Sequence, residues 1–142
     1  MATVTHDGQS FMIDSRRIWL VAGQIHAAKL AGFNAIATSI PWALHEPRPG
    51  QFDFKGQRDL RQFVQYIHAA GMYCILRPEP YIGAGWDMGG IPDWAARKTD
   101  IKLRAASAPF LEAASRYITA VAEQVRDLQV TSPGEGGPIV LL

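Results

Sequence analysis

The residues best suited to chemistry follow a short apolar run at residues 72–76. Arg77 and Glu79 come directly after this run, and Trp86 and Asp87 follow a few positions later among several glycines. Glycine lets the backbone approach a ligand closely. In α/β folds, ligands bind at the carboxyl ends of parallel strands. An aromatic and polar loop at this place predicts a ligand cleft whose composition suits carbohydrate, among other ligands.

Two carboxylates of this loop, Glu79 and Asp87, could form a general acid/base pair. Asp87 more often caps a turn by accepting a backbone N–H, and we expect no catalysis from the pair. Trp86 has two open interpretations, stacking on a sugar face or packing. Gly83 and Gly85 resemble part of a dinucleotide-binding loop, but no helix start follows them, so we reject that interpretation.

A second polar and aromatic loop follows the apolar run at residues 33–40. Its Trp42 could stack on a sugar, but a Trp after a proline is more often packed. Its Glu46 could bind a sugar hydroxyl, and we favour instead an ion pair with Arg77.

Two histidines, His26 and His45, end predicted strands and could converge. No third ligand accompanies them at a suitable spacing, so we predict no metal site and assign both to the scaffold or the cleft wall. Cys74, the single cysteine, lies inside the predicted strand, which excludes a disulfide framework and a redox motif. We assign Cys74 and Met88 to packing and predict no cofactor.

Composition narrows the classes of protein. The chain has 142 residues, 48% hydrophobic and 19% charged, which suits one globular domain. A net charge of +1 gives no basis for a nucleic-acid partner. No apolar run approaches the roughly 18 residues of a membrane span, so we predict no membrane partner. The start lacks the features of a signal peptide, which favours the cytoplasm; the oligomeric state stays open.

Periodicity and turn signals predict the elements that position these loops. Residues 1–17 form a β-hairpin lead-in with turns at Asp7-Gly8 and Asp14-Ser15. A fully buried strand is expected at residues 72–76. Helices with an apolar face or a cap signal are expected at residues 57–70, 93–97 and 108–128, the last with Ser107 as N-cap. The other predicted strands are residues 18–22, 33–40 and 139–142.

The connection between the first two strands of this series is unusually short. Only AAKLAG separates His26 from Phe33, whereas a crossover between parallel neighbours needs about a dozen residues. Either these strands are not parallel neighbours or most of a helix is missing. We favour the second alternative, with residues 29–32 as the end of that helix.

The resulting order alternates strands and helices, which predicts a parallel sheet with right-handed crossovers. An open doubly wound sheet and a (β/α)8 barrel both fit that order. A complete barrel needs about 250 residues. We therefore predict an α/β fold in which residues 18–142 are strands 1 to 4, about the first half of a TIM-type barrel, with the first helix mostly missing.

Several motifs resemble the start of the catalytic domain of family 35 glycoside hydrolases, the β-galactosidase family. They are LVAGQIH, HEPRPGQFDFKG, ILRPEPYI, WDMGG and GGPIVLL, and the resemblance covers the chain from about Asp7 to Leu142. The resemblance implies a barrel enzyme that releases terminal β-galactose with retention, using two carboxylates about 5–5.5 Å apart. It also implies a β-galactoside as the substrate.

The same resemblance implies substrate-binding positions. The family's Cys-Ala-Glu-Trp-Asp aligns with Gly83-Ala84-Gly85-Trp86-Asp87, so Ala84, Gly85 and Trp86 stand at the galactose site, with Gly85 in place of a hydroxyl-binding Glu. Ser39 stands where the family has a substrate-contacting Tyr. The acid/base Glu of the family, in an Asn-Glu pair, and its nucleophile Glu both fall after Leu142, so we expect no catalytic residue in this chain.

Three interpretations follow. The chain is a glycoside hydrolase given in part, a non-catalytic remnant or carbohydrate-binding fragment, or a complete small α/β domain of unrelated function. We rank the last lowest, because an open parallel edge at the fourth strand would favour aggregation.

Overall fold

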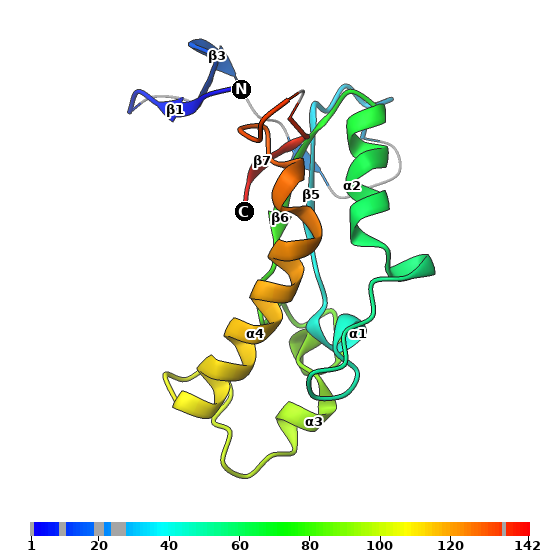
Figure 1. Cartoon of the computed structure of the whole chain (residues 1–142), viewed down its shortest axis with the longest axis vertical. Coiled ribbons are helices and arrows are strands. Elements are labelled where there is room, and N and C mark those ends of the chain that lie inside the picture. Colours follow the sequence, from blue (N-terminus) through cyan, green and yellow to red (C-terminus); the bar gives the residue numbers. More distant parts are fainter. Residues whose placement is uncertain (1, 9–10, 19–21, 24–27, 135) are drawn as a thin grey trace. The chain divides into compact units, whose positions relative to one another are not determined.

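The computed structural model describes residues 2–8, 11–18, 22–23, 28–134 and 136–142 (Figure 1). The chain divides into two compact units, which are described separately. Unit 1 comprises Met1–Thr38, Arg61–Arg77 and Val125–Leu142, and unit 2 comprises Ser39–Leu60 and Pro78–Gln124.

The chain begins with an antiparallel sheet of β1 (Val4–His6), β2 (Phe11–Ile13) and β3 (Arg16–Ile18). Asp14 and Ser15 join β2 to β3 with φ angles of 50° and 64°, which suit a two-residue hairpin turn. The predicted lead-in is confirmed and has a third strand. Ile18 pairs with Phe11 in that sheet, so the prediction that Ile18 opens the first parallel strand is wrong. Residues 19–21 of that strand lie outside the described residues.

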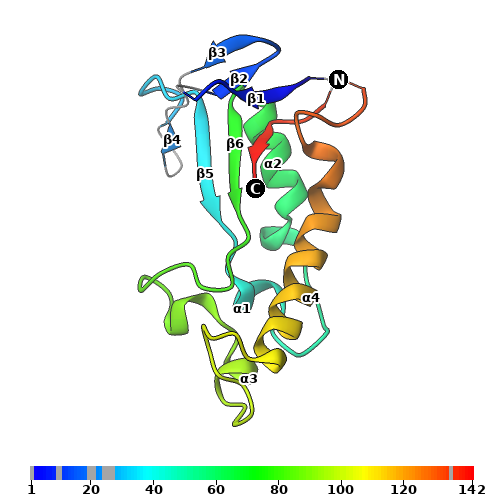
Figure 2. The ribbon, with the colours of Figure 1, turned by 90° about the vertical axis from the view of Figure 1, so that its left-hand side faces the viewer.

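A second sheet holds β4 (Ala22–Gly23), β5 (Ala35–Ser39), β6 (Tyr73–Arg77) and β7 (Ile139–Leu141), in that spatial order (Figure 2). The β4/β5 and β6/β7 pairs are parallel. Strands and helices alternate along the chain from β5 to β7, which confirms the predicted α/β class. The described strands do not close into a barrel.

The described part of the connection from β4 to β5, residues 28–34, agrees with its prediction. Residues 28–34 contain turns, with Gly32 at φ +83° and the Phe33 N–H donating to the Ala28 carbonyl at 2.8 Å. The Gly32 N–H also donates to the Lys29 carbonyl at 3.1 Å. These two bonds, with Gly32 in the left-handed region, form the Schellman pattern that closes a helix C-terminus, so residues 29–32 have the helix-end geometry that the sequence predicted. β4 and β5 are parallel neighbours, which removes one of the two alternatives. His26 lies outside the described residues.

Strand β6 is buried on one face only. Cys74 and Leu76 are fully buried, while Tyr73, Ile75 and Arg77 are half-buried. Helix α2 (Leu60–Ala69) lies along one side of the sheet and buries Val64 and Ile67 (Figures 1 and 2). The prediction of a strand buried on both faces is wrong, because the described residues cover the two faces unequally.

Two helix boundaries differ from the predicted ones, and one predicted loop contains a helix. The chain forms a separate 3₁₀ turn at η1 (Gly56–Arg58) before α2 begins. The predicted loop after β5 contains a short helix, α1 (Trp42–His45). The long helix α4 (Ala108–Val125) ends in a 3₁₀ turn, η3 (Arg126–Leu128). Two further short helices are η2 (Asp87–Gly90) and α3 (Asp93–Ala96).

Ser107 precedes α4, as predicted, and its carbonyl accepts the N–H groups of Phe110 and Leu111. Its hydroxyl donates to the Lys102 carbonyl at 3.1 Å. Within the described residues, no helix combines the length and hydropathy that a membrane crossing requires.

An aromatic cluster forms the core of unit 2. Trp42 is fully buried and stacks on Tyr117, with ring centroids 5.3 Å apart, and it meets Trp94 edge-on at 5.7 Å. The Tyr117 hydroxyl donates to the Ile40 carbonyl at 2.5 Å. The interpretation of Trp42 as a packed residue is confirmed, because no face of its ring is left for a sugar.

Candidate active-site loop

Residues 78–92, the loop after β6, have a shape fixed by their own backbone. Met88 and Gly89 adopt left-handed conformations at φ +50° and +67°. The Gly89 N–H donates to the Trp86 carbonyl, and the Ile82 N–H donates to the Gly89 carbonyl, both at 2.8 Å. These bonds close a tight turn whose tip carries Ala84, Gly85 and Trp86.

Tyr81 anchors this turn from inside unit 2. A Cβ atom on Gly89 would overlap the Tyr81 ring, so the backbone packs against that ring at a distance that only glycine permits. The Arg104 guanidinium lies over the Tyr81 ring, 4.1 Å from its centroid, a cation–π contact. Neither Arg104 nor Gly89 was identified from the sequence as part of the site. The only sequence feature that indicates the positive φ of Gly89 is the pair of consecutive glycines, Gly89 and Gly90.

The turn presents its predicted ligand contacts to solvent. Ala84, Gly85 and Trp86 are all exposed, and the Trp86 residue is 48% exposed. Met88 is 54% exposed, so its assignment to packing is wrong. Ser39 is half-buried at the end of β5. The turn thus presents an aromatic side chain of the kind that stacks on a sugar face.

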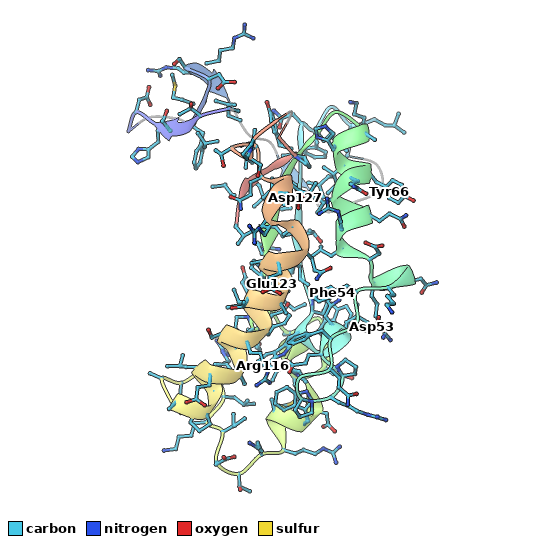
Figure 3. All side chains as sticks on the ribbon, in the orientation of Figure 1. Asp53, Phe54, Tyr66, Arg116, Glu123 and Asp127 are labelled. Carbon is cyan, nitrogen blue, oxygen red and sulfur yellow. The ribbon has the colours of Figure 1, made fainter. Side chains whose placement is uncertain are left out.

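Glu46 is fully buried and belongs to a closed hydrogen-bond network (Figure 3 shows Arg116). Its carboxylate accepts Trp42 Nε1–H and the Gly50 N–H, both at 2.6 Å, and the Arg116 guanidinium at 2.7 and 3.1 Å. The Glu46 carbonyl accepts Trp94 Nε1–H at 2.9 Å. The predicted ion pair with Arg77 is wrong, since Arg116 supplies the positive charge.

No motif in the sequence points to Arg116 as the partner of Glu46. It lies one position before the apolar residue Tyr117 on α4, and only the packing of α4 beside α1 within unit 2 brings it to Glu46. Because its partners occupy both carboxylate oxygens, Glu46 is a scaffold residue and not a sugar contact.

His45 is also part of the scaffold. It is 5% exposed, its Nδ1 lies 3.1 Å from the Asp53 carbonyl, and its ring stacks on Phe54 at 4.9 Å. Burial lowers its pKa below the ordinary 6.5, partly opposed by the Asp53 carbonyl and reinforced by Arg58. Among the described residues, no group of three or more His, Cys, Asp or Glu side chains could hold a metal ion.

Two carboxylates and one thiol complete this region. Glu79 and Asp87 are both exposed. Burial raises the pKa of the Cys74 thiol to about 12, so the thiolate is scarce at neutral pH. The assignment of Cys74 to packing is confirmed.

The motifs around this loop match a known family. The model of glycosyl hydrolases family 35 matches residues 10–142, nearly the whole chain. The chain belongs to glycosyl hydrolase family 35. The fold and loop described above are therefore those of a glycosyl hydrolase family 35 chain.

Curated relatives carry the same family's activity in their names. A β-galactosidase of Canis lupus familiaris is 34% identical over 99% of this chain, and one of Mus musculus is 37% identical over 92%. β-Galactosidase 14 of Arabidopsis thaliana is 35% identical over 97%. This family 35 chain spans 23%, 22% and 17% of these relatives, about a fifth of their length.

A solved structure supports the fold alone. An exo-β-1,4-mannosidase, Op5Man5, from Opitutaceae bacterium strain TAV5 superposes with a TM-score of 0.61 over 80% of this chain and 18% of that one. The sequence identity is 21%. The α/β arrangement of this family 35 chain thus recurs in another glycoside hydrolase.

Proposed function

We propose that this chain is the first part of a retaining β-galactosidase barrel and that its role there is to hold terminal β-galactose, not to cleave the bond. The observation that carries the proposal is the family 35 match over residues 10–142. The names of the relatives, all β-galactosidases, supply the substrate class.

The turn after β6 supplies the binding group in this proposal. Trp86 stacks on the apolar face of galactose, and Ala84 and Gly85 let the ring approach the backbone. Ser39, at the end of the neighbouring strand β5, offers one hydroxyl. Gly85 lacks the carboxylate that would accept galactose hydroxyls, so the affinity of this chain for the sugar is weak.

The chemistry requires carboxylates that this chain does not supply. A retaining mechanism needs an acid/base and a nucleophile about 5–5.5 Å apart. The exposed Glu79 and Asp87 are unsuited to these roles, and we assign both to sequence outside these residues. A non-catalytic remnant that binds sugar remains the second interpretation, favoured by the same Gly85 and Ser39.

Galactose titration followed by tryptophan emission tests the binding role. We expect a saturable change at a dissociation constant on the order of millimolar, lost in Trp86→Ala. The matched control is Leu111→Ala, another exposed apolar residue, 52% exposed on α4, which should keep the change. The emission of Trp42 should not respond to galactose, because this side chain is fully buried.

Two results would overturn the proposal. One is a galactose response that survives in Trp86→Ala. The other is an equal response to mannose, which differs in hydroxyl orientation and would show that the loop does not select galactose.

A further inference from the structure

Met88 has a backbone conformation that suits glycine better than methionine. Its φ and ψ angles are 50° and 24°, in the left-handed region, where the Cβ atom of an L-residue crowds the following carbonyl oxygen. The next two residues, Gly89 and Gly90, also have positive φ, at 67° and 83°, and they have no Cβ atom to crowd. The side chain at position 88 is therefore kept at a cost to the backbone.

Two hydrogen bonds and one ring contact hold Met88 in this conformation. The Trp86 carbonyl accepts the Gly89 N–H at 2.8 Å, and the Met88 carbonyl accepts the Ile91 N–H at 3.3 Å. Position 88 is thus shared by two successive turns. Gly89 also lies against the Tyr81 ring, which restricts the peptide after Met88. A strained residue persists only when its surroundings fix it in this way, and such residues cluster at ligand sites.

The Met88 side chain does not contribute to the core of unit 2. The Met88 residue is 54% exposed, and Trp86, two positions earlier in the same turn, is 48% exposed. An exposed methionine offers a flexible and polarisable apolar surface that adapts to ligands of different shape. The turn thus presents two apolar side chains to solvent, and the proposed binding of galactose uses only Trp86.

The chemistry of a β-galactoside indicates what Met88 meets. A pyranose ring stacks on an aromatic side chain through an apolar face, and Trp86 takes that face in the proposed function. The edges of the ring carry hydroxyl groups, which lose hydrogen bonds to water beside an apolar side chain. Only the substituent on the anomeric oxygen, the aglycone, varies between β-galactosides and can be apolar. An apolar aglycone therefore matches Met88.

We propose that Met88 is a specificity-determining residue that contacts the aglycone of a β-galactoside held at Trp86 and favours an alkyl aglycone over a methyl group. This inference rests on the proposed function, because Trp86 must first hold the galactose ring. The hydrogen bonds of the turn keep Met88 near Trp86, so that one bound molecule meets both side chains.

Two β-galactosides that differ only in their aglycone test the proposal with the whole chain. Methyl β-galactoside and butyl β-galactoside are titrated separately, and tryptophan emission reports binding. We expect the parent chain to bind butyl β-galactoside about fivefold more tightly, because three further methylene groups are partly removed from water. Met88→Gly should bring this ratio close to one and change the dissociation constant of methyl β-galactoside less than about twofold, because Trp86 is intact.

Four variants and a thermal melt separate the side chain from the backbone. Met88→Leu keeps an apolar side chain of similar volume and should keep the ratio. Leu111→Ala, at an exposed apolar position of α4, should also keep it. Met88→Gly should melt no lower than the parent chain, because glycine is unstrained at this φ. Met88→Asn, a polar residue that tolerates the left-handed region, should lose the ratio as Met88→Gly does.

Three results would overturn the inference while leaving galactose binding intact. The parent chain could bind the two galactosides equally, the preference for butyl β-galactoside could survive in Met88→Gly or Met88→Asn, or it could be lost in Met88→Leu. The last result would assign the preference to the backbone of the turn. A parent chain that binds neither galactoside would instead contradict the proposed function, and this inference would fall with it.

Discussion

Glu46 is fully buried in unit 2 and accepts hydrogen bonds from Trp42, Gly50, Trp94 and Arg116. A carboxylate removed from water is tolerated only when its charge is paired and its lone pairs are filled. Trp42, Gly50 and Arg116 meet both conditions, and together they tie the loop after β5 to α4. Glu46 of the HEP motif thus stabilises the fold of unit 2.

We predict that Glu46→Ala destabilises the chain by about 1–3 kcal/mol, because it leaves the buried Trp42 Nε1–H without an acceptor. Gly50 and the Arg116 side chain are exposed, so water can replace the bonds that they lose. Urea denaturation measures the change. The control is Glu123→Ala, an exposed position of α4, which should shift the midpoint little. Equal effects of the two changes would contradict the network.

His45 predicts a pH dependence of stability. Its folded pKa lies below 6.5, chiefly because of burial, so the unfolded chain binds a proton that the folded chain does not. The free energy of unfolding should therefore be unaffected above about pH 6.5 and fall as the pH drops from there toward the folded pKa. Urea midpoints between about pH 8 and pH 5.5 measure the trend.

His45→Gln should flatten that trend, while His68→Gln, at an exposed position of α2, should leave it unchanged. Hydrogen bonds from the Lys55 N–H and the Arg58 side chain lower the pKa of Asp53. Its effect on stability therefore falls at more acidic pH and can be separated from that of His45. A slope that persists without His45 would assign the effect to another group.

At the scale of elements, the turn after β6 depends on glycine at one position. Gly89 has a positive φ and lies against the Tyr81 ring. Gly85 in the same turn has no atom within 4 Å of the place where a Cβ would stand and no positive φ. The two positions thus separate structural from functional effects within one loop.

We predict that Gly89→Ala lowers the free energy of unfolding by about 2–4 kcal/mol, because the new Cβ overlaps the Tyr81 ring and alanine is strained at this positive φ. The change should also abolish the galactose response of Trp86. Gly85→Ala should leave the free energy of unfolding unchanged, because a Cβ there meets no other atom. Thermal melts and the same titration measure both. A stable Gly89→Ala chain with an intact galactose response would show that Tyr81 does not set the turn.

At the scale of the whole molecule, this family 35 chain has an α/β fold whose described strands do not close into a barrel. We predict that the 142-residue chain does not hydrolyse p-nitrophenyl β-galactoside above the buffer rate, because Glu79 and Asp87 are exposed and no retaining pair is present in the described site. Turnover abolished by Glu79→Gln or Asp87→Asn would contradict this. Turnover that survives both changes would indicate a contaminating enzyme.

The sequence determined the features that depend on neighbouring residues. Apolar periodicity fixed α4 with its buried Phe110, Tyr117 and Val121, and turn signals fixed the lead-in hairpin at Asp14 and Ser15. Motif order identified the family. These features are predictable because side chains a few positions apart decide them.

Only the tertiary structure decided which distant residues meet. It paired Glu46 with Arg116 in place of Arg77, exposed Met88 and left one face of β6 half-covered. None of these follows from spacing, because each depends on how helices far apart in the chain pack and on which surfaces they leave uncovered. Interactions between residues close in sequence thus specified the elements and the family, and tertiary packing specified the charge partner of Glu46 and the exposed turn after β6.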